Sequence, residues 1–195
     1  MEFVFGYGSL TTLADPPPSR APDPRGYVTD LPGHRRRWGV AADNRSALPG
    51  YKRYRDAGGA YPPVAVAFLD LAPGDGLVNG VCLPVAAGAL AALDARERNY
   101  ERVEVTAQLA QALGPTWAYV GSAEGRARLA DGRARGAAVV TREYRDLVLA
   151  GFSALGAGEL ARFHASSDLD DLPLVELERV DLDGRAAPRG AAPPD

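Results

Sequence analysis

The sequence predicts an α+β fold, because short strand-like segments outnumber helical ones and the helices fall between and after the strands. An apolar strand at residues 3–5 opens the chain, and strand-like segments recur up to residue 120. Two helical patterns, at residues 84–98 and 142–155, interrupt and follow them. A doubly wound α/β fold would instead alternate strands and helices along the chain.

The strand candidates are short and are bounded by glycine and proline. After the first strand we expect strands at residues 26–31, 38–42, 64–71, 77–83, 103–109 and 117–120. The pair 64–71 and 77–83 flanks a Pro-Gly-Asp-Gly break and is predicted to form a hairpin. The proline-rich segment 15–25 and the polar segment 43–59 are predicted to be loops, and loops this long are often functional.

Sequence signals at the helix starts support both helix predictions. Pro84 suits the first turn of the helix at 84–98. Thr141 is a good cap for the helix at 142–155, which a shorter helix ending near His164 follows. We expect one domain at residues 1–165 and a C-terminal extension at 166–195, partly disordered, whose Pro/Gly/Ala-rich end begins at residue 184.

The composition argues against several classes of function. The 195 residues carry a formal net charge of −3, from 22 basic and 25 acidic side chains, so no nucleic-acid partner is predicted. Cys82 is the single cysteine and His34 and His164 are the two histidines, so neither a metal site nor a cofactor is predicted. The sequence shows no leader-like segment and no apolar run that would span a bilayer, which predicts a cytoplasmic protein without a membrane partner.

Glu97 is the most informative residue. Leu90, Leu93 and Glu97 follow one another at spacings of three and four, which puts them on one face of the predicted helix. The leucines are expected to face the core, so the carboxylate points inward too. Burial raises the pKa of a carboxyl group and suits it to exchange protons near neutral pH. The alternative is a solvated, salt-bridged helix end, because charged residues surround Glu97 in the sequence.

A glycine loop directly after the first strand is the second candidate feature. Gly6-Tyr7-Gly8-Ser9-Leu10 offers backbone N–H groups that can hold a carboxylate or a developing oxyanion. The loop lacks the spacing and the lysine of a P-loop and is not a dinucleotide fingerprint. A plain turn is the alternative interpretation.

Together these features resemble the γ-glutamylcyclotransferase superfamily, including its ChaC-like branch. Tyr7-Gly8-Ser9-Leu10 is similar to the substrate loop of that family, and the segment 93–100 around Glu97 is similar to the one that carries its essential glutamate. Weaker similarities lie at 32–38, at Asp43-Asn44-Arg45, at 118–120 and at 141–144. The resemblance covers about residues 2 to 160, whereas the proline-rich insert and the C-terminal tail have no counterpart.

The resemblance implies a small, mostly antiparallel β-barrel with flanking helices and a pocket at one end. It further implies a small-molecule γ-glutamyl substrate, which releases 5-oxoproline when its α-amine attacks its own γ-carbonyl. Glu97 would act as the catalytic acid/base, and the substrate-binding residues would be Tyr7, Gly8, Ser9, Leu10, Tyr100, Tyr119 and Tyr144. For each tyrosine, a core or surface position is the alternative.

Other interpretations of the chain remain open at this point. A non-catalytic member of the same fold would bind a γ-glutamyl or amino-acid ligand, and an unrelated α+β interaction domain would need no pocket at Glu97. Cys82 is interpreted as a buried structural cysteine. The run Arg35-Arg36-Arg37 is interpreted as a solvated strand end, and the acidic residues Asp168, Asp170 and Asp171 as a solvated face. The sequence indicates neither the oligomeric state nor which γ-glutamyl compound is used.

Overall fold

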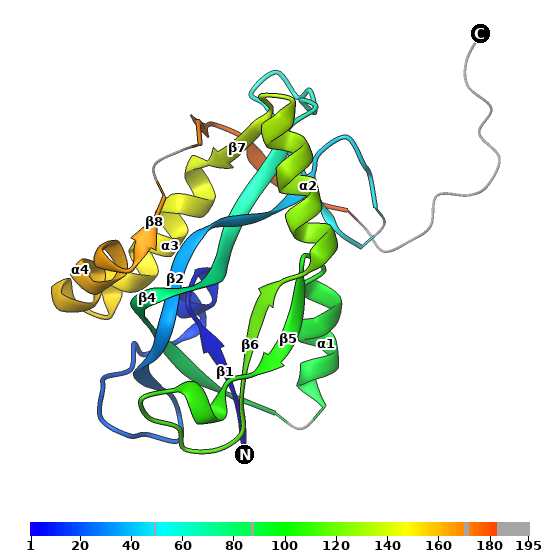
Figure 1. The fold of residues 1–195 in the computed structure, drawn as a ribbon. Coiled ribbons are helices and arrows are strands. Elements are labelled where there is room, and N and C mark those ends of the chain that lie inside the picture. The colour runs from blue at the N-terminus through cyan, green and yellow to red at the C-terminus, as the bar shows by residue number, and fades with distance from the viewer. Residues whose placement is uncertain (49, 87, 170–171, 183–195) are drawn as a thin grey trace, which may run out of the picture.

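A computed structural model of the chain describes residues 1–48, 50–86, 88–169 and 172–182. Two long antiparallel strands, β2 (Tyr27–Asp43) and β4 (Ala65–Val85), run through the centre of the molecule (Figure 1). The tail predicted to be disordered, residues 184–195, lies outside the described residues, as do Asp170 and Asp171.

The main sheet is mixed, in the strand order β5-β6-β1-β4-β2-β8. β1 (Glu2–Gly6) is antiparallel to β4 and parallel to β6 (Thr116–Gly121), and β6 is antiparallel to β5 (Tyr100–Glu104). β8 (Ser167–Asp168) is parallel to β2. The α+β prediction is confirmed. The closed barrel is not: among the described residues this strand order is an open path, because no pairing joins β5 to β8.

The predicted hairpin between 64–71 and 77–83 is wrong, since both segments belong to the single strand β4. The two halves of β4 pair with the two halves of β2, which likewise merges the predicted strands 26–31 and 38–42. The register shifts between Pro32 and His34. A Cβ on Gly76 would lie 2.3 Å from the carbonyl oxygen of His34. Glycine at this position therefore allows β2 and β4 to approach each other closely, and it does not mark a hairpin turn.

Short strands and four helices complete the fold. β7 (Ala138–Thr141) pairs with β4 and with β9 (Leu174–Val175). β3 (Lys52–Arg55) pairs with β10 (Glu178–Asp181). β3 lies within the segment predicted to be a loop, and β10 lies within the predicted C-terminal extension. The helices are α1 (Ala89–Arg96), α2 (Ala123–Ala134), α3 (Arg142–Ala154) and α4 (Ala157–Ala165). No helix within these ranges is long and apolar enough to cross a bilayer. The domain boundary at residue 165 stays a prediction.

Two helix predictions can be compared directly with the structure. The Thr141 side chain accepts a hydrogen bond from the Tyr144 amide at the start of α3, which confirms the predicted cap. Helix α1 is shorter than predicted, because Pro84 and Val85 remain in β4 opposite Phe3 and Glu2. The predicted strand at 103–109 is also wrong beyond Glu104, where the chain turns into a short 3-10 helix at Thr106–Gln108.

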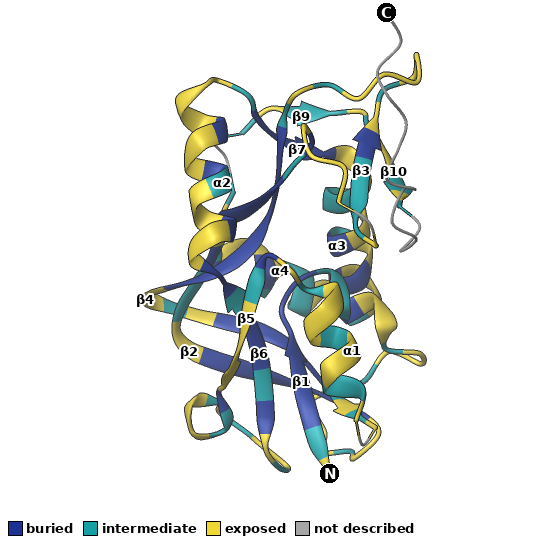
Figure 2. Cartoon of the chain, turned by 90° about the vertical axis from the view of Figure 1, so that its right-hand side faces the viewer, coloured by how far each residue is buried: buried dark blue, intermediate teal, exposed yellow. Residues whose placement is uncertain are grey.

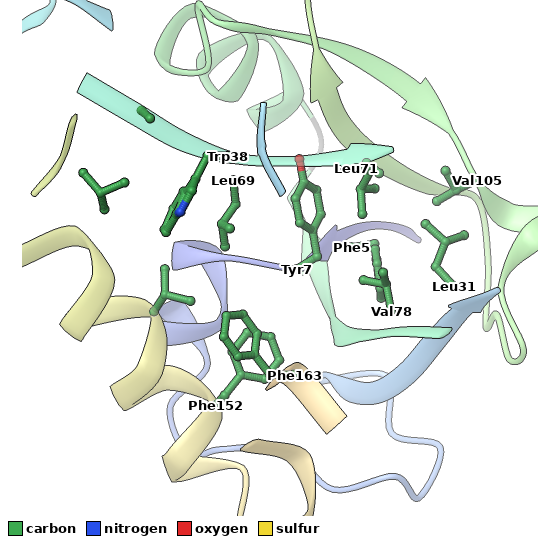
Figure 3. Packing of buried hydrophobic residues seen from close by; sticks show 14 of the residues in the cluster. Phe5, Tyr7, Leu31, Trp38, Leu69, Leu71, Val78, Val105, Phe152 and Phe163 are labelled. Atoms are coloured by element: carbon green, nitrogen blue, oxygen red, sulfur yellow. The ribbon is translucent and has the colours of Figure 1, made fainter. Parts of the chain in front are cut away.

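Besides a smaller apolar cluster around Val40, Val66 and Phe68, the sheet and the helices enclose a larger apolar core. Burial is greatest along β1, β2 and β4, whereas α1 and α2 expose most of their outer faces (Figure 2). Phe5, Leu31, Leu71 and Val78 pack in one part of this core, while Phe152 and Phe163 pack in another, with ring centroids 4.6 Å apart (Figure 3). These buried strands support the glycine loop that follows β1.

Arg36 corrects the interpretation of the arginine run as a solvated strand end. Its side chain is fully buried on β2, and its guanidinium lies 4.9 and 4.8 Å from the ring centroids of Phe152 and Phe163. Nε donates to the carbonyl oxygen of Tyr7 over 2.8 Å, and the other nitrogens donate to Ser166 and Asn79. The alternating side chains of β2 turn Arg36 into the core, beneath the glycine loop.

Candidate active site

Glu97 lies immediately after helix α1, at the point where the chain leaves the helix. Its backbone N–H donates to Leu93 over 2.8 Å, and its carbonyl accepts from the Tyr100 amide over 2.9 Å in a tight turn into β5. Leu90 and Leu93 are half-buried, and the Glu97 side chain is 18% exposed. The Glu97 side chain is therefore largely buried, but α1 has no buried residue and neither leucine packs against the apolar core, so the leucines do not face the core as the helical spacing predicts.

A small inner cavity of about 40 Å³ lies beside this carboxylate. Strand β1 supplies the loop that follows it, α1 supplies the acid, and β5, β6 and α3 each supply one tyrosine. All eight residues predicted for the site line this cavity: Tyr7, Gly8, Ser9, Leu10, Glu97, Tyr100, Tyr119 and Tyr144. Phe5 and Leu69 are the other lining residues. The structure thus brings together side chains that are up to 137 positions apart in the chain.

The glycine loop, which lines this cavity, contains backbone amides that have no described acceptor. A short 3-10 helix, Ser9–Leu13, begins within the loop, and the first N–H groups of a helix have no intrahelical acceptor. Within the described residues, the amides of Gly8, Ser9 and Leu10 donate to no acceptor. A Cβ on Gly6 would lie only 2.8 Å from the Leu10 Cβ, so glycine at position 6 allows the loop to fold back on itself.

Hydrogen bonds to backbone and side-chain oxygens hold three of the four tyrosines in place. The Tyr7 hydroxyl donates to the Tyr119 carbonyl over 2.5 Å, and the Tyr100 hydroxyl donates to the Leu69 carbonyl over 2.7 Å. The Tyr119 hydroxyl donates to Asp94 over 2.8 Å. The Tyr144 oxygen instead accepts a 3.4 Å hydrogen bond from the Leu69 amide, and the Ser9 side chain is a second hydrogen-bond partner of this hydroxyl.

The surroundings keep these phenols protonated. Burial raises the pKa of Tyr7, Tyr100 and Tyr144 well above its ordinary value, and the negative charge of Glu97 raises all three further. Burial and the hydrogen bond to Asp94 raise the pKa of Tyr119. At neutral pH the tyrosines therefore supply hydrogen-bond donors and apolar walls, and Glu97 is the single carboxylate that lines the inner cavity.

The Glu97 carboxylate itself is held loosely. Its nearest cation is Arg96, whose Nε lies 3.4 Å from Oε1 and whose side chain is half-exposed. No described group donates a hydrogen bond to either carboxylate oxygen. A carboxylate with free acceptor positions at the wall of a cavity can take a proton from a ligand and return it.

A second, outer cavity of about 290 Å³ meets the first at Glu97. The two cavities share Ser9, Glu97, Tyr100 and Tyr144 as lining residues. Strands β3 and β10, which lie side by side in Figure 2, form much of the outer wall through Lys52, Tyr54, Arg179 and Asp181. Sequence analysis missed these residues. The two signals it had were the length of the loop at 43–59 and the fact that Lys52 is the only lysine of the chain.

Several other candidates lie outside the two cavities. Asp43 and Arg45 pair with each other at 2.7 Å, while Asn44 is buried and bonds to the backbone of Tyr54. Burial raises the pKa of Cys82 to about 11, which keeps the thiol protonated and confirms a buried structural cysteine. Over the part of the chain that the structure describes, no group of three or more His, Cys, Asp or Glu side chains is placed to hold a metal ion.

Comparison with known proteins agrees with this geometry. The family model described as "Gamma-glutamyl cyclotransferase, AIG2-like" matches residues 4–136, more than half of the chain. The matched range contains the glycine loop, Glu97, Tyr100 and Tyr119, and it ends before Tyr144. No curated protein matches the chain.

Proposed function

Because the chain belongs to the AIG2-like γ-glutamyl cyclotransferase family, we propose that it is an active enzyme that releases 5-oxoproline from a γ-glutamyl amino acid, peptide or amine. The observation that carries the proposal is the position of Glu97, which lines one cavity together with Gly8, Ser9 and Leu10, whose amides have no described acceptor. A base beside a set of backbone donors is what acyl transfer requires.

The reaction is an intramolecular aminolysis in which Glu97 moves the protons. The substrate's α-ammonium gives one proton to the Glu97 carboxylate, and the free amine attacks the γ-carbonyl carbon. A carbon–nitrogen bond forms, closing the five-membered lactam. The original bond to the leaving amine breaks, and the protonated Glu97 returns its proton to that amine. The ring nitrogen gives up its second proton to the departing amine, which leaves as an ammonium ion. The substrate supplies the proximity of nucleophile and carbonyl, so the protein has to provide only orientation and charge.

The loop amides are proposed to stabilise the negative charge that develops during the attack. When the amine adds to the carbonyl carbon, the γ-carbonyl oxygen becomes an oxyanion, and preorganised N–H donors stabilise such a charge. The amides of Gly8, Ser9 and Leu10 are free to do this, and Arg36 fixes the loop by bonding to the Tyr7 carbonyl. The protonated Tyr144 hydroxyl lines the same cavity and can serve as a further donor.

The two cavities suggest how the substrate is divided between them. The γ-glutamyl part lies in the inner cavity against the glycine loop, and the leaving amine lies at Glu97, where the cavities meet. The remainder of the leaving group then extends into the outer cavity. This arrangement keeps the reacting atoms among buried tyrosines and leaves the variable part of the substrate near the surface.

The test is release of 5-oxoproline from a panel that contains glutathione, γ-glutamyl amino acids and γ-glutamylamines. We expect turnover of at least one class, with stoichiometric release of the free amine. If the folded protein releases no 5-oxoproline from any class yet binds γ-glutamyl ligands in calorimetry, the protein is a binding member of the fold and the catalytic proposal is wrong.

A further inference from the structure

Lys52 is a cation of the outer cavity that the proposed reaction does not use. Lys52 and Tyr54 alternate with Arg53 and Arg55 along β3, so the first two side chains share the face that lines the cavity. The Lys52 Nζ lies 4.1 Å from the ring centroid of Phe68 and 5.6 Å from that of Tyr51. The ammonium is thus positioned by two aromatic rings.

No carboxylate of the described residues lies within ion-pair distance of this ammonium. Asp181 is opposite Lys52 in the β3–β10 pair, but it accepts hydrogen bonds from Arg179, with Nη2 2.6 Å away. The second cation, Arg96, is paired with Glu97. The remaining acid of the cavity wall, Glu143, accepts from the Arg179 backbone amide. Among the described cations of this wall, Lys52 alone has no anionic partner.

An ammonium in this position is expensive without a counter-ion. Burial, followed by the neighbouring cations Arg179 and Arg96, lowers the pKa of Lys52 to about 8, because Glu97 and Asp181 only partly offset these effects. A half-buried charged group without an anionic partner, at the wall of a cavity, is typical of a ligand-binding position. An anionic ligand group would supply the missing partner.

We propose that Lys52 binds a carboxylate on the leaving-group side of the substrate, so that the enzyme selects γ-glutamyl amino acids or peptides with a free carboxylate over uncharged γ-glutamyl alkylamines. This inference rests on the proposed cyclotransferase function. It follows from the position of Lys52 in the outer cavity, because the leaving amine lies at Glu97 and its substituents extend toward β3. The lining residues of the inner cavity do not include Lys52, so the γ-glutamyl part is expected not to contact it.

The experiment compares two substrates that differ only in this charge: a γ-glutamyl amino acid that the enzyme cleaves, and the same compound with its leaving-group carboxylate converted to the amide. The variant is Lys52→Met, which keeps the length of the side chain and its contact with Phe68. The matched control is Arg55→Met, which removes a positive charge from the opposite face of the same strand, where Arg55 pairs with Glu178 at 2.9 Å.

We expect the unmodified enzyme to prefer the acid over the amide by about 10-fold or more in kcat/KM, the range for a charge-assisted contact. Lys52→Met should remove this preference, mainly through a higher KM for the acid, and leave the amide within about 2-fold. Arg55→Met should leave both substrates unchanged.

Three outcomes would overturn the assignment or its premise. An equal loss for acid and amide in Lys52→Met would place Lys52 at the γ-glutamyl part or in a purely structural role. A preference of the unmodified enzyme for the amide would contradict carboxylate recognition directly. Absence of 5-oxoproline release from every compound of the panel would instead contradict the proposed function, on which this inference rests.

Discussion

Replacing Glu97 by glutamine is the most direct perturbation of the proposed mechanism. Glutamine keeps the size and shape of the side chain but cannot accept the substrate's proton. Proton transfer by a positioned side chain contributes about 10²-fold or more to turnover. A 10²-fold loss of kcat corresponds to a rise of about 2.7 kcal/mol in the activation free energy.

The structure also predicts that this variant folds normally. The Glu97 carboxylate has one ion pair, 3.4 Å from a half-exposed Arg96, and accepts no hydrogen bond from a described group. Partly exposed pairs of this kind contribute at most about 1 kcal/mol to the free energy of unfolding. We therefore expect a large change in turnover with a small change in the urea denaturation midpoint.

The assay measures 5-oxoproline under saturating substrate, with Glu101→Gln as the matched control. Glu101 is an exposed residue of β5, four positions further along the chain, and it lines neither cavity at the site. Full turnover by Glu97→Gln would refute the acid/base assignment. An equal loss in both variants would show that the effect comes from the charge of this region and not from proton transfer.

Three further perturbations follow from the structure. Gly6→Ala places a Cβ about 2.8 Å from the Cβ of Leu10, so the glycine loop must shift. We expect kcat to fall by about 10-fold or more, while an unchanged circular dichroism spectrum shows that the fold is kept. Arg36→Met leaves the buried carbonyl of Tyr7 without its donor, and we expect the free energy of unfolding in urea titrations to fall by about 2–4 kcal/mol; an unchanged value would contradict this. Lys52→Met should raise the stability at pH 7, because a folded-state pKa of about 8, below the ordinary 10.5, means that the folded chain holds this proton less tightly than the unfolded chain. The full shift corresponds to about 3 kcal/mol, which solvent in the outer cavity reduces to about 1–2 kcal/mol. The unmodified protein gains this stability as the pH rises from 8 to 10.5, so the advantage of the variant should disappear above pH 10.5, as thermal melts at several pH values would show.

The inner cavity could be predicted from the sequence because its signals are local. The Gly-x-Gly loop after a strand and the 3-then-4 spacing that ends at Glu97 are both readable within ten residues. The helical periodicity predicted that Glu97 points inward, which it does although α1 ends one residue before it, but the two leucines that defined that face do not pack against the core. What the sequence does not contain is the distance between the two segments, which the pairing of β1, β6 and β5 sets.

The outer cavity and the long strands could not be predicted, because their causes are not local. Glycine and proline at 73–76 indicate a turn in isolation, yet β2 supplies enough paired backbone to carry β4 straight through. Lys52 resembles a surface lysine in the sequence. Only the pairing of β3 with β10, a strand more than 120 residues later in the sequence, places the Lys52 side chain above the Phe68 ring and on the side of Glu97. The burial of Arg36 likewise depends on two phenylalanines from α3 and α4.

The two cavities also differ in which part of the chain builds them. The family match at residues 4–136 contains every lining residue of the inner cavity except Tyr144. Much of the outer wall comes from later residues, on α3 and around β10. A proton-transferring acid and its donor loop suit any γ-glutamyl compound, because the lactam that forms is the same for each. The leaving group is what differs between substrates. In the proposed arrangement it contacts Lys52 in the outer cavity, whose wall β10 completes. Substrate preference should therefore depend on Lys52, which lies within the family match, together with the β10 segment beyond it, whereas Glu97 and the glycine loop lie wholly within the match.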